Sequence, residues 1–386
     1  MRVLDFGRYI AGPFCGALLG DLGADVIRIE KVDGSEDRFT VPVNEEGVGA
    51  GFLQLNRNKR GITLNPRKPE GQDLLKRLVS TADVVLANLP PDTVASMGLD
   101  YDTLCAIKAD IILATSTAFG SKGPYGTRVG FDGVAQAMSG NLHMTGHADE
   151  PMKNCYPYVD YCTGALNTVA ILAAIVHRMQ TGEGQHVEGA LLASAVTIAG
   201  GQLVEQALTK ANRKATGNRG QTSGPSDVFK TRDGWIIVQV VGNPLFERWA
   251  KLMGEDHWLE DARFASDEAR GIHGELITER MSAWTQTRTT KEAMAELEIA
   301  RVPCGEVLTP AGTLENEQVK AMGLIEDCTY PGIGSYPLTR MPFDMSRMTQ
   351  TVRRRPPTLG EHTDEVLTEL GYTEAEVALL KEHRVV

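Results

Sequence analysis

Residues 2–31 read "RVLDFGRYIAGPFCGALLGDLGADVIRIEK", in which two short apolar runs flank a glycine-containing turn and a helical stretch. The pattern predicts a strand over 2–6, a helix over 13–23 and a second strand over 24–31. Alternation of strands and helices favours a parallel sheet that is covered by helices. The N-terminal stretch therefore predicts an α/β fold.

The same alternation continues through the first half of the chain. Further strands are predicted over 61–65, 83–88, 110–116 and 184–190, and further helices over 69–82, 161–181 and 191–208. We therefore expect a large domain over 1–208 with a Rossmann-like parallel sheet.

The composition changes after this domain. Residues 209–226, "TKANRKATGNRGQTSGPS", are basic, rich in glycine and weakly apolar, which is typical of a linker or a mobile loop. A strong strand over 233–241 and amphipathic helical segments over 244–300 follow. They predict a smaller α+β domain over 227–310. The remaining segment, 311–386, closes with two predicted helices.

Composition limits the class of protein. The chain has 386 residues, 42% hydrophobic and 23% charged residues, and a net charge of −11. The negative charge argues against nucleic acid or an anionic membrane as the main partner. No stretch approaches the apolar length that spans a bilayer, and the N-terminus, "MRVLDFG", lacks the pattern of a signal peptide.

The cysteines and histidines give no sign of a metal site. Six cysteines are scattered without a CxxC pair, and eight histidines show no zinc-binding spacing. The cysteines are typical of reduced thiols in a cytoplasmic protein, and we expect no bound metal.

A lone carboxylate stands out in "YPYVDYCTGALNTVAILAAIVHRMQTGEGQ", residues 156–185. Asp160 lies among aromatic and small residues, directly before a long apolar run. One interpretation makes it the N-cap of the helix that follows. The other makes it a nucleophile, and the local pattern is compatible with both.

The first turn does not suit a dinucleotide. "FGRYIAGPFCG", residues 6–16, lacks the GxGxxG pattern and places Pro13 and Phe14 where a pyrophosphate would need small residues. Basic residues near the predicted strand ends could still hold a phosphate-bearing cofactor, although each one alone is better explained as part of a solvated rim. They are Arg28, Lys31, Arg38, Lys59, Arg60 and Arg67.

Six segments, in order, resemble the class III CoA-transferases, the CaiB/BaiF family that also contains carnitine CoA-transferases and α-methylacyl-CoA racemases. They begin with residues 3–31 and continue with "LNRNKRGITLNPRKPEG" (55–71), "ADVVLANLPPDTVASMGLDYDTL" (82–104), "GFDGVAQAMSG" (130–140), "RMQTGEGQHVEGAL" (178–191) and "LGEHTDEVLTELGYTEAEVALL" (359–380). The resemblance covers essentially the whole chain.

The resemblance implies an architecture. Members of the family form an interlocked homodimer, in which each chain threads through the ring of the other. Their large domain combines N- and C-terminal parts around a six-stranded parallel sheet, so 311–386 would complete the large domain. The small domain would come from the middle of the chain.

The resemblance also implies a mechanism, with Asp160 as the catalytic residue. Its carboxylate would attack an acyl-CoA donor to give an aspartyl anhydride, and CoA would return to form an aspartyl–CoA thioester. A small organic acid would then take over the CoA through a second anhydride. With an ordinary pKa near ~4, Asp160 would be ionised at pH 7 and need no general base.

CoA contacts are implied by position in the matching segments. They fall on Ile10, Ala11, Lys31, Leu64, Asn65, Arg67, Asn88, Met97, Arg128, Phe131 and Asp132. The chain departs from the family at "LPPD" (89–92), where many relatives have "FRPG", and at Ser96, where an arginine is expected. We therefore expect Arg67 or Arg128 to supply a phosphate contact.

Relatives cover the catalytic acid with a glycine-rich loop. The candidate lid here is "TGNRGQTSG", residues 216–224, in which Gly217, Gly220 and Gly224 supply backbone freedom. An interdomain linker explains the same stretch equally well.

A CoA-binding chain of this family has two alternatives to a transferase function. Racemases of the family carry a histidine within "GHD", whereas this chain reads "GFD" at 130–132, and Phe131 cannot move a proton. A CoA-binding protein without catalysis would keep the nucleotide segments and be indifferent to Asp160. The sequence does not identify the donor or the acceptor acid.

Overall fold

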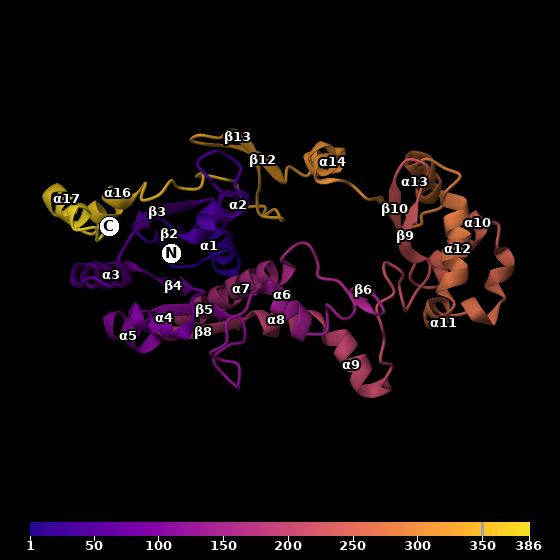
Figure 1. Ribbon diagram of the computed structural model, residues 1–386, viewed down its shortest axis with the longest axis horizontal. Coiled ribbons are helices and arrows are strands. Elements are labelled where there is room, and N and C mark those ends of the chain that lie inside the picture. The colour runs from indigo at the N-terminus through magenta and orange to yellow at the C-terminus, as the bar shows by residue number, and fades with distance from the viewer. Residues whose placement is uncertain (349–350) are drawn as a thin grey trace. The chain divides into compact units, whose positions relative to one another are not determined.

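The computed structural model describes residues 1–348 and 351–386 of the chain (Figure 1). Packing divides the chain into two compact units. Unit 1 contains 1–141, 154–209 and 320–386, and unit 2 contains 142–153 and 210–319. Composition had placed the boundaries elsewhere, because it did not reveal that 142–153 and 210–226 pack with the smaller unit.

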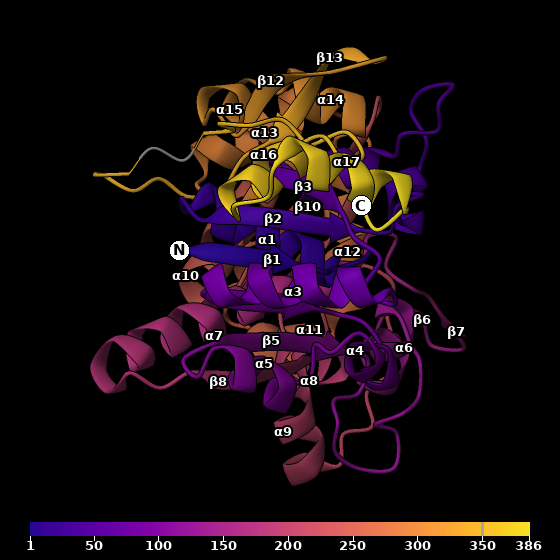
Figure 2. The ribbon, with the colours of Figure 1, turned by 90° about the vertical axis from the view of Figure 1, so that its left-hand side faces the viewer.

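Unit 1 is built on a six-stranded parallel sheet with the strand order β3-β2-β1-β4-β5-β8. The labels β3, β2, β1, β5 and β8 follow one another from top to bottom in Figure 2. The strands are β1 (Arg2–Asp5), β2 (Asp25–Glu30), β3 (Lys59–Thr63), β4 (Val84–Ala87), β5 (Ile112–Thr117) and β8 (Gln185–Ala190). The predicted α/β fold with a parallel sheet is confirmed.

Helices cover both faces of this sheet. The helices of unit 1 are α1 (Ala11–Asp21), α2 (Ala50–Leu55), α3 (Pro69–Thr81), α4 (Pro91–Ser96), α5 (Tyr101–Ile107), α6 (Asp132–Met138), α7 (Tyr158–Thr181), α8 (Leu191–Ile198), α9 (Gly200–Thr209), α16 (Thr363–Glu369) and α17 (Glu374–Glu382), with the short helix η1 (Glu36–Phe39). Among them α9 buries no residue. The hairpin β12 (Ile325–Tyr330) and β13 (Gly334–Thr339) also lies in unit 1.

Successive strand residues point to opposite faces, and the two faces have separate cores. Leu4 and Val85 belong to the cluster that contains residues of α3, α16 and α17. Val3 and Val84, their neighbours in sequence, belong to the cluster with Cys15 of α1 and residues of α7. The period of two therefore explains why these strands are buried almost throughout.

The C-terminal segment completes the first of these cores. Figure 1 shows α16 and α17, in yellow, beside β3. The Gly61 N–H donates to His362 Nδ1 over 3.1 Å, and the Asn65 N–H donates to the Val385 carbonyl over 2.8 Å. Arg60 of β3 forms ion pairs with Glu365 and Glu369 at 2.9 and 2.6 Å.

Helix α7 corrects one expectation about membranes. Its 24 residues are long and apolar enough, by length and composition, to cross a bilayer, although no such stretch was expected. The buried side of α7, which includes Thr163, Asn167 and Ile171, packs on α1 and the sheet. Apolar length alone therefore does not make it a membrane span.

The helix expected over 191–208 is two helices. α8 ends at Ile198 and α9 begins at Gly200, and their axes differ by 62°. Gly200 and Gly201 carry no side chain that would stabilise a continuous helix, and glycine disfavours a helix interior. The uninterrupted helix was therefore a wrong prediction.

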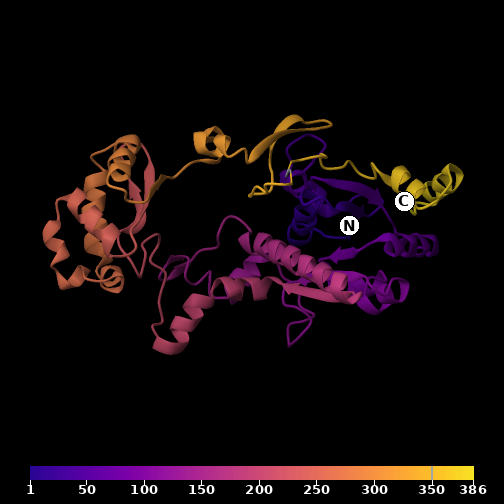
Figure 3. The same ribbon diagram turned by 180° about the vertical axis from the view of Figure 1, so that it is seen from behind.

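Unit 2 contains a three-stranded antiparallel sheet with the order β11-β10-β9. Figure 3 shows the chain from behind, with the helices of this unit in pink to orange. The strands of unit 2 are β9 (Ser226–Lys230), β10 (Trp235–Gln239) and β11 (Cys304–Glu306) in this sheet, and β6 (Gly146–His147) and β7 (Glu150–Pro151) in a separate two-stranded sheet. Its helices are α10 (Asn243–Met253), η2 (Asp256–Leu259), η3 (Ala262–Phe264), α11 (Asp267–Ile272), α12 (Gly274–Thr285), α13 (Thr290–Ile299) and α14 (Pro310–Glu315); α15 (Glu317–Ala321) spans the boundary. Trp249 and Phe246 lie in its buried core.

Candidate active site

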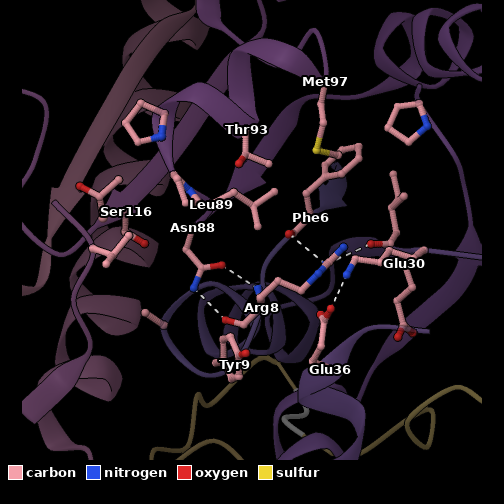
Figure 4. A pocket seen from close by; sticks show the side chains of 18 of the residues that line it. Phe6, Arg8, Tyr9, Glu30, Glu36, Asn88, Leu89, Thr93, Met97 and Ser116 are labelled. Carbon is pink, nitrogen blue, oxygen red and sulfur yellow. Dashed lines mark hydrogen bonds and ion pairs between the residues drawn. The ribbon is translucent and has the colours of Figure 1, made fainter. Parts of the chain in front are cut away.

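A cavity of about 910 Å³ opens at the carboxyl ends of the strands of unit 1. The strand order reverses between β1 and β4, because β2 and β3 lie on one side of this pair and β5 and β8 lie on the other. Open α/β sheets bind ligands at such a topological switch point. The residues after β1, β2, β3, β4 and β5 line this switch-point cavity, together with Asp160 of α7 and Leu191 of α8. Figure 4 shows part of the lining.

Asn88, which follows β4, fixes the turn between β1 and α1. Its side-chain oxygen accepts from the Arg8 N–H over 2.6 Å, and its side-chain nitrogen donates to the Arg8 carbonyl over 2.8 Å (Figure 4). A Cβ atom on Gly12 would lie 2.9 Å from both Asn88 Oδ1 and Gly7 Cα. Glycine at position 12 therefore permits this clasp across the switch point.

A buried network of charges lies beneath the turn. Lys59 Nζ, with no exposed surface, lies 2.6 Å from Asp5 Oδ2 and donates to the Pro13 carbonyl over 2.8 Å. Burial lowers the pKa of Lys59 to about 8, against the effect of Asp5. Arg28 lies 2.8 Å from Asp37.

This network corrects the expectation for the basic residues near the strand ends. Arg28, Arg38, Lys59 and Arg60 are all buried with carboxylate partners. They form neither a solvated rim nor an open phosphate site. Lys31 and Arg67 of the same set do line the cavity and are exposed.

Arg8 is a cation of the lining that the sequence did not single out. Its Nη1 donates to the carbonyls of Phe6, Gly7 and Ile29 over 3.0, 2.8 and 3.2 Å. Among residues 1–348 and 351–386, no carboxylate forms an ion pair with it. Burial and the charge of Arg28 hold the pKa of Arg8 below its usual value. An anionic group of a ligand would compensate this charge.

Two further cations reach the cavity through the C-terminal segment. Lys68 donates to the His383 carbonyl, and Arg384 pairs with Asp33. Both Lys68 and Arg384 line the cavity. The approach of residue 384 to the β2 end depends on the tertiary fold, so no local pattern could have indicated it.

Ten of the eleven residues expected to contact CoA line the cavity. They are Ile10, Ala11, Lys31, Leu64, Asn65, Arg67, Asn88, Met97, Arg128 and Phe131. Phe131 is 64% exposed, and its ring meets that of Tyr9 edge-on with centroids 5.7 Å apart. Whether these residues contact CoA stays a prediction.

Asp132, the eleventh residue, is buried at the start of α6 and lies outside the lining. Its Oδ2 accepts the N–H groups of Val159 and Asp160 over 2.7 and 3.1 Å. It thus caps the first turn of α7. This role could not be read from its place in the sequence.

Asp160 lines the cavity as the third residue of α7. The residue at the N-cap position is Pro157, and α7 has no side-chain cap from that position. Since Asp132 accepts the N–H groups of the first turn, the interpretation of Asp160 as the helix cap is wrong. Its carboxylate is therefore available to a ligand in the cavity.

The charge state of Asp160 also differs from expectation. Burial, and then the charge of Asp132, raise the pKa of Asp160 to about 7. The carboxyl is therefore close to half ionised at neutral pH, whereas the sequence had suggested full ionisation. A carboxylate that is desolvated in this way is a stronger base and a better nucleophile than one in water.

Ser116, near the end of β5, is a further residue that the sequence did not single out. It is buried, lines the cavity, and its hydroxyl has no hydrogen-bond partner within the part of the chain that the structure describes. A buried hydroxyl without a partner is costly, so a bound ligand would satisfy it.

The candidate lid belongs to unit 2. The Gly217 N–H donates to the Gly146 carbonyl over 2.7 Å, and the Gly220 N–H donates to the Ser226 carbonyl over 2.6 Å. Gly217 has a φ of 67°, which favours glycine. The role of Gly217, Gly220 and Gly224 as a lid stays a prediction.

Comparison with known proteins gives consistent results. Residues 1–363 match CoA-transferase family III. The chain is 34% identical to succinate–glutarate CoA-transferase of Agrobacterium fabrum, over 96% of this chain and 94% of that protein. It is 32% identical to succinyl-CoA–D-citramalate CoA-transferase of Chloroflexus aurantiacus, over 100% and 97%. A CaiB/BaiF family protein of Brucella suis has a similar crystal structure, with a TM-score of 0.84, 33% identity, and coverage of 96% and 98%.

Proposed function

The chain belongs to CoA-transferase family III and is a CoA-transferase, and from this premise we propose that it works through covalent intermediates on Asp160. The observation that supports the proposal most directly is the position of Asp160. Its carboxylate lines the switch-point cavity and is not used as a helix cap.

The proposed reaction has four balanced steps. The Asp160 carboxylate attacks the donor thioester and displaces CoA thiolate, which leaves a mixed anhydride. The thiolate attacks the aspartyl carbonyl, which forms the aspartyl–CoA thioester and releases the donor acid. The acceptor carboxylate displaces CoA thiolate to form a second anhydride. The thiolate then attacks the acceptor carbonyl, which gives the new acyl-CoA and regenerates Asp160.

Cations of the lining support CoA as the ligand. Arg8 lacks a carboxylate partner among the described residues, and Lys31, Arg67, Lys68 and Arg384 also line the cavity. We propose that phosphate groups of CoA bind among them. Lys31, Lys68 and Arg384 would have to exchange their present partners for phosphate oxygens.

Substrates are proposed from the relatives that the chain resembles. Their names include succinate, glutarate and D-citramalate. We propose succinyl-CoA as the donor and a small dicarboxylic or hydroxy-dicarboxylic acid as the acceptor. Mass spectrometry of the products from a panel of carboxylates tests this choice, and transfer only to monocarboxylates would contradict it.

A racemase or a non-catalytic CoA-binding protein is less well supported. Phe131 lies in the cavity where a racemase of the family would carry its histidine, and a phenyl ring cannot exchange a proton. A binding protein without catalysis would not need a carboxylate in the cavity. Neither alternative accounts for both Phe131 and Asp160 in the cavity.

A homodimer is part of the proposal. Apolar side chains of α7, α8 and α9 are exposed in the single chain, and a second copy would cover them. They are Leu166, Val169, Leu172, Val176, Met179, Val196, Ile198, Leu203, Val204 and Leu208. We further propose that the protein acts in the cytoplasm, where its six free cysteines would stay reduced.

Covalent trapping tests the catalytic proposal. The protein is incubated with succinyl-CoA, quenched with hydroxylamine or borohydride, and digested for peptide mass spectrometry, which detects an aspartyl hydroxamate or the reduced alcohol. Modification is expected on Asp160. Full turnover without any adduct at Asp160 would contradict the proposal.

A further inference from the structure

Two carboxylates meet at the start of α7. Asp132 is 5% exposed, and its Oδ2 accepts from Val159 N–H at 2.7 Å and from Asp160 N–H at 3.1 Å. The second of these N–H donors belongs to the proposed nucleophile itself. The backbone of Asp160 and the carboxylate of Asp132 are therefore joined directly.

Gln136 holds Asp132 in place from the next turn of α6. Its side-chain nitrogen donates to Asp132 Oδ1, and its side-chain oxygen accepts the Asn154 N–H over 3.1 Å. Gln136 is 2% exposed. Both oxygens of Asp132 therefore have donors, and the side chain cannot turn away without losing them.

This arrangement changes the electrostatic environment of Asp160. The free N–H groups of a helix start normally favour an anion, but here two of them point at Asp132. The helix start thus stabilises the charge of Asp132 instead of that of Asp160. Asp132 in turn repels the Asp160 carboxylate.

Few other titratable groups face Asp160. Tyr161 follows it on α7, and Tyr9 and Arg128 line the same cavity. Of the elements packed on α7, β5 and α8 carry no titratable residue, α1 carries Cys15 and Asp21, and β8 carries His186 and Glu188. Asp132 is the group whose charge acts on Asp160 most strongly.

We propose that Asp132 is a positioning residue for the transfer reaction: its carboxylate orients the first turn of α7 and keeps Asp160 basic enough to be an effective nucleophile. The inference rests on the proposed function, in which Asp160 forms the covalent bonds. A more basic carboxylate attacks a thioester faster, while only its ionised form reacts. The rate of attack is therefore expected to rise with pH as Asp160 loses its proton.

The test is the pH dependence of Asp160 acylation in the variant Asp132→Asn. Asparagine keeps the volume and an oxygen that can accept the two N–H groups, but it removes the charge. The rate of adduct formation from succinyl-CoA is measured in single turnovers by rapid quench between pH 5 and 9. The pH at which the rate reaches half of its plateau is the midpoint, and it is expected to fall by at least about one pH unit, because a like charge is lost. The plateau rate is expected to fall several-fold, because the carboxylate becomes less basic.

Asp100→Asn provides a matched control. Asp100 caps α5 of the same unit, where its side chain accepts the Thr103 N–H over 3.0 Å, and it lies outside the cavity lining. The same chemical change at this cap is expected to leave the midpoint and the plateau where they are in the wild type.

The outcomes separate this inference from the proposed function. If Asp160 forms the adduct and the pH dependence of its formation has the same midpoint in the wild type and in Asp132→Asn, the inference alone is overturned. Absence of adduct on Asp160 in the wild type during turnover would overturn the proposed function. If Asp132→Asn does not fold, Gln136→Leu replaces it: release of Asp132 is expected to lower the midpoint and slow labelling, and an unchanged profile would overturn the inference.

Discussion

At the scale of single residues, Asp160 carries the chemistry. Asp160→Ala and Asp160→Asn are expected to lose several orders of magnitude in turnover, because no neighbouring group can form the anhydride. The measurement is the initial rate of CoA transfer from succinyl-CoA. Both variants should still form the dimer and bind CoA. Light scattering checks the first property, and equilibrium binding of CoA checks the second.

The stability of Asp160→Asn has a predictable sign. The pKa of Asp160 is raised to about 7 by burial and by Asp132, so between the ordinary carboxyl value and pH 7 the folded state holds a proton that the unfolded state releases. Raising the pH through this window destabilises the wild type but not the variant. The variant is expected to melt higher above pH 7, by about 2 °C or more, and equally near pH 4. If Asp160→Asn melted at a lower temperature than the wild type at pH 8, the buried charge of Asp160 would not destabilise the fold.

Arg8→Ala tests the unpaired cation. Loss of a charge-assisted contact is expected to raise KM for succinyl-CoA by roughly 10- to 100-fold with little change in kcat. Arg77→Ala is the control, because Arg77 stacks on Tyr372 outside the cavity lining. Equal effects of the two variants on KM would show that Arg8 does not contact the ligand.

At the scale of elements, the turn between β1 and α1 sets the geometry of the switch point. Gly12→Ala would force a Cβ against Asn88 Oδ1 and Gly7 Cα, each at 2.9 Å. We expect a loss of about 1–3 kcal/mol in the free energy of unfolding, measured by urea titration, and a raised KM.

Gly51→Ala is the matched control for that variant. Gly51 lies within α2, and a Cβ there would have no heavy atom within 4 Å. Alanine should therefore be neutral or stabilising by up to about 1 kcal/mol. Destabilisation of similar size in both variants would mean that the clasp at Asn88 is not the cause.

Elements with a strong apolar pattern could be predicted from the sequence, and elements with a weak apolar pattern could not. The strands β1, β2 and β4 each contain buried aliphatic residues, so their places were evident from the sequence. The strands β6 and β7 have two residues each and no apolar pattern. The bend after Ile198 lies at Gly200 and Gly201, and these glycines do not interrupt the hydrophobic pattern over 191–208.

At the scale of the whole molecule, we expect a dimer that does not dissociate on dilution. The exposed apolar side chains on α7, α8 and α9 would otherwise face water. Static light scattering at micromolar protein should give twice the chain mass of 41.9 kDa. A monomer of 41.9 kDa under these conditions would contradict this proposal.

The candidate site was predictable where it consists of local motifs. Asp160 and ten of the residues that were expected to contact CoA lie in one cavity. Most of the ten lie in segments that follow strands of the parallel sheet, whereas Asp160 reaches the cavity from the start of α7. Arg384 and the cap by Asp132 arise from contacts between distant segments. Likewise, the raised pKa of Asp160 depends on burial and on Asp132, which only the tertiary structure brings together.

The return of the C-terminal segment to β3 has a consequence for biosynthesis. Gly61 and its partner His362 are 301 residues apart, and the core beside them needs Val366, Leu380 and Val385. At about 5–20 residues per second, a ribosome would reach these residues roughly 15 to 60 s after the strand they cover. During that interval this face of the nascent sheet lacks the part of its cover that residues 363–386 provide. A chaperone that binds apolar segments is therefore expected to associate with ribosome-bound chains and to leave once residues 363–386 emerge.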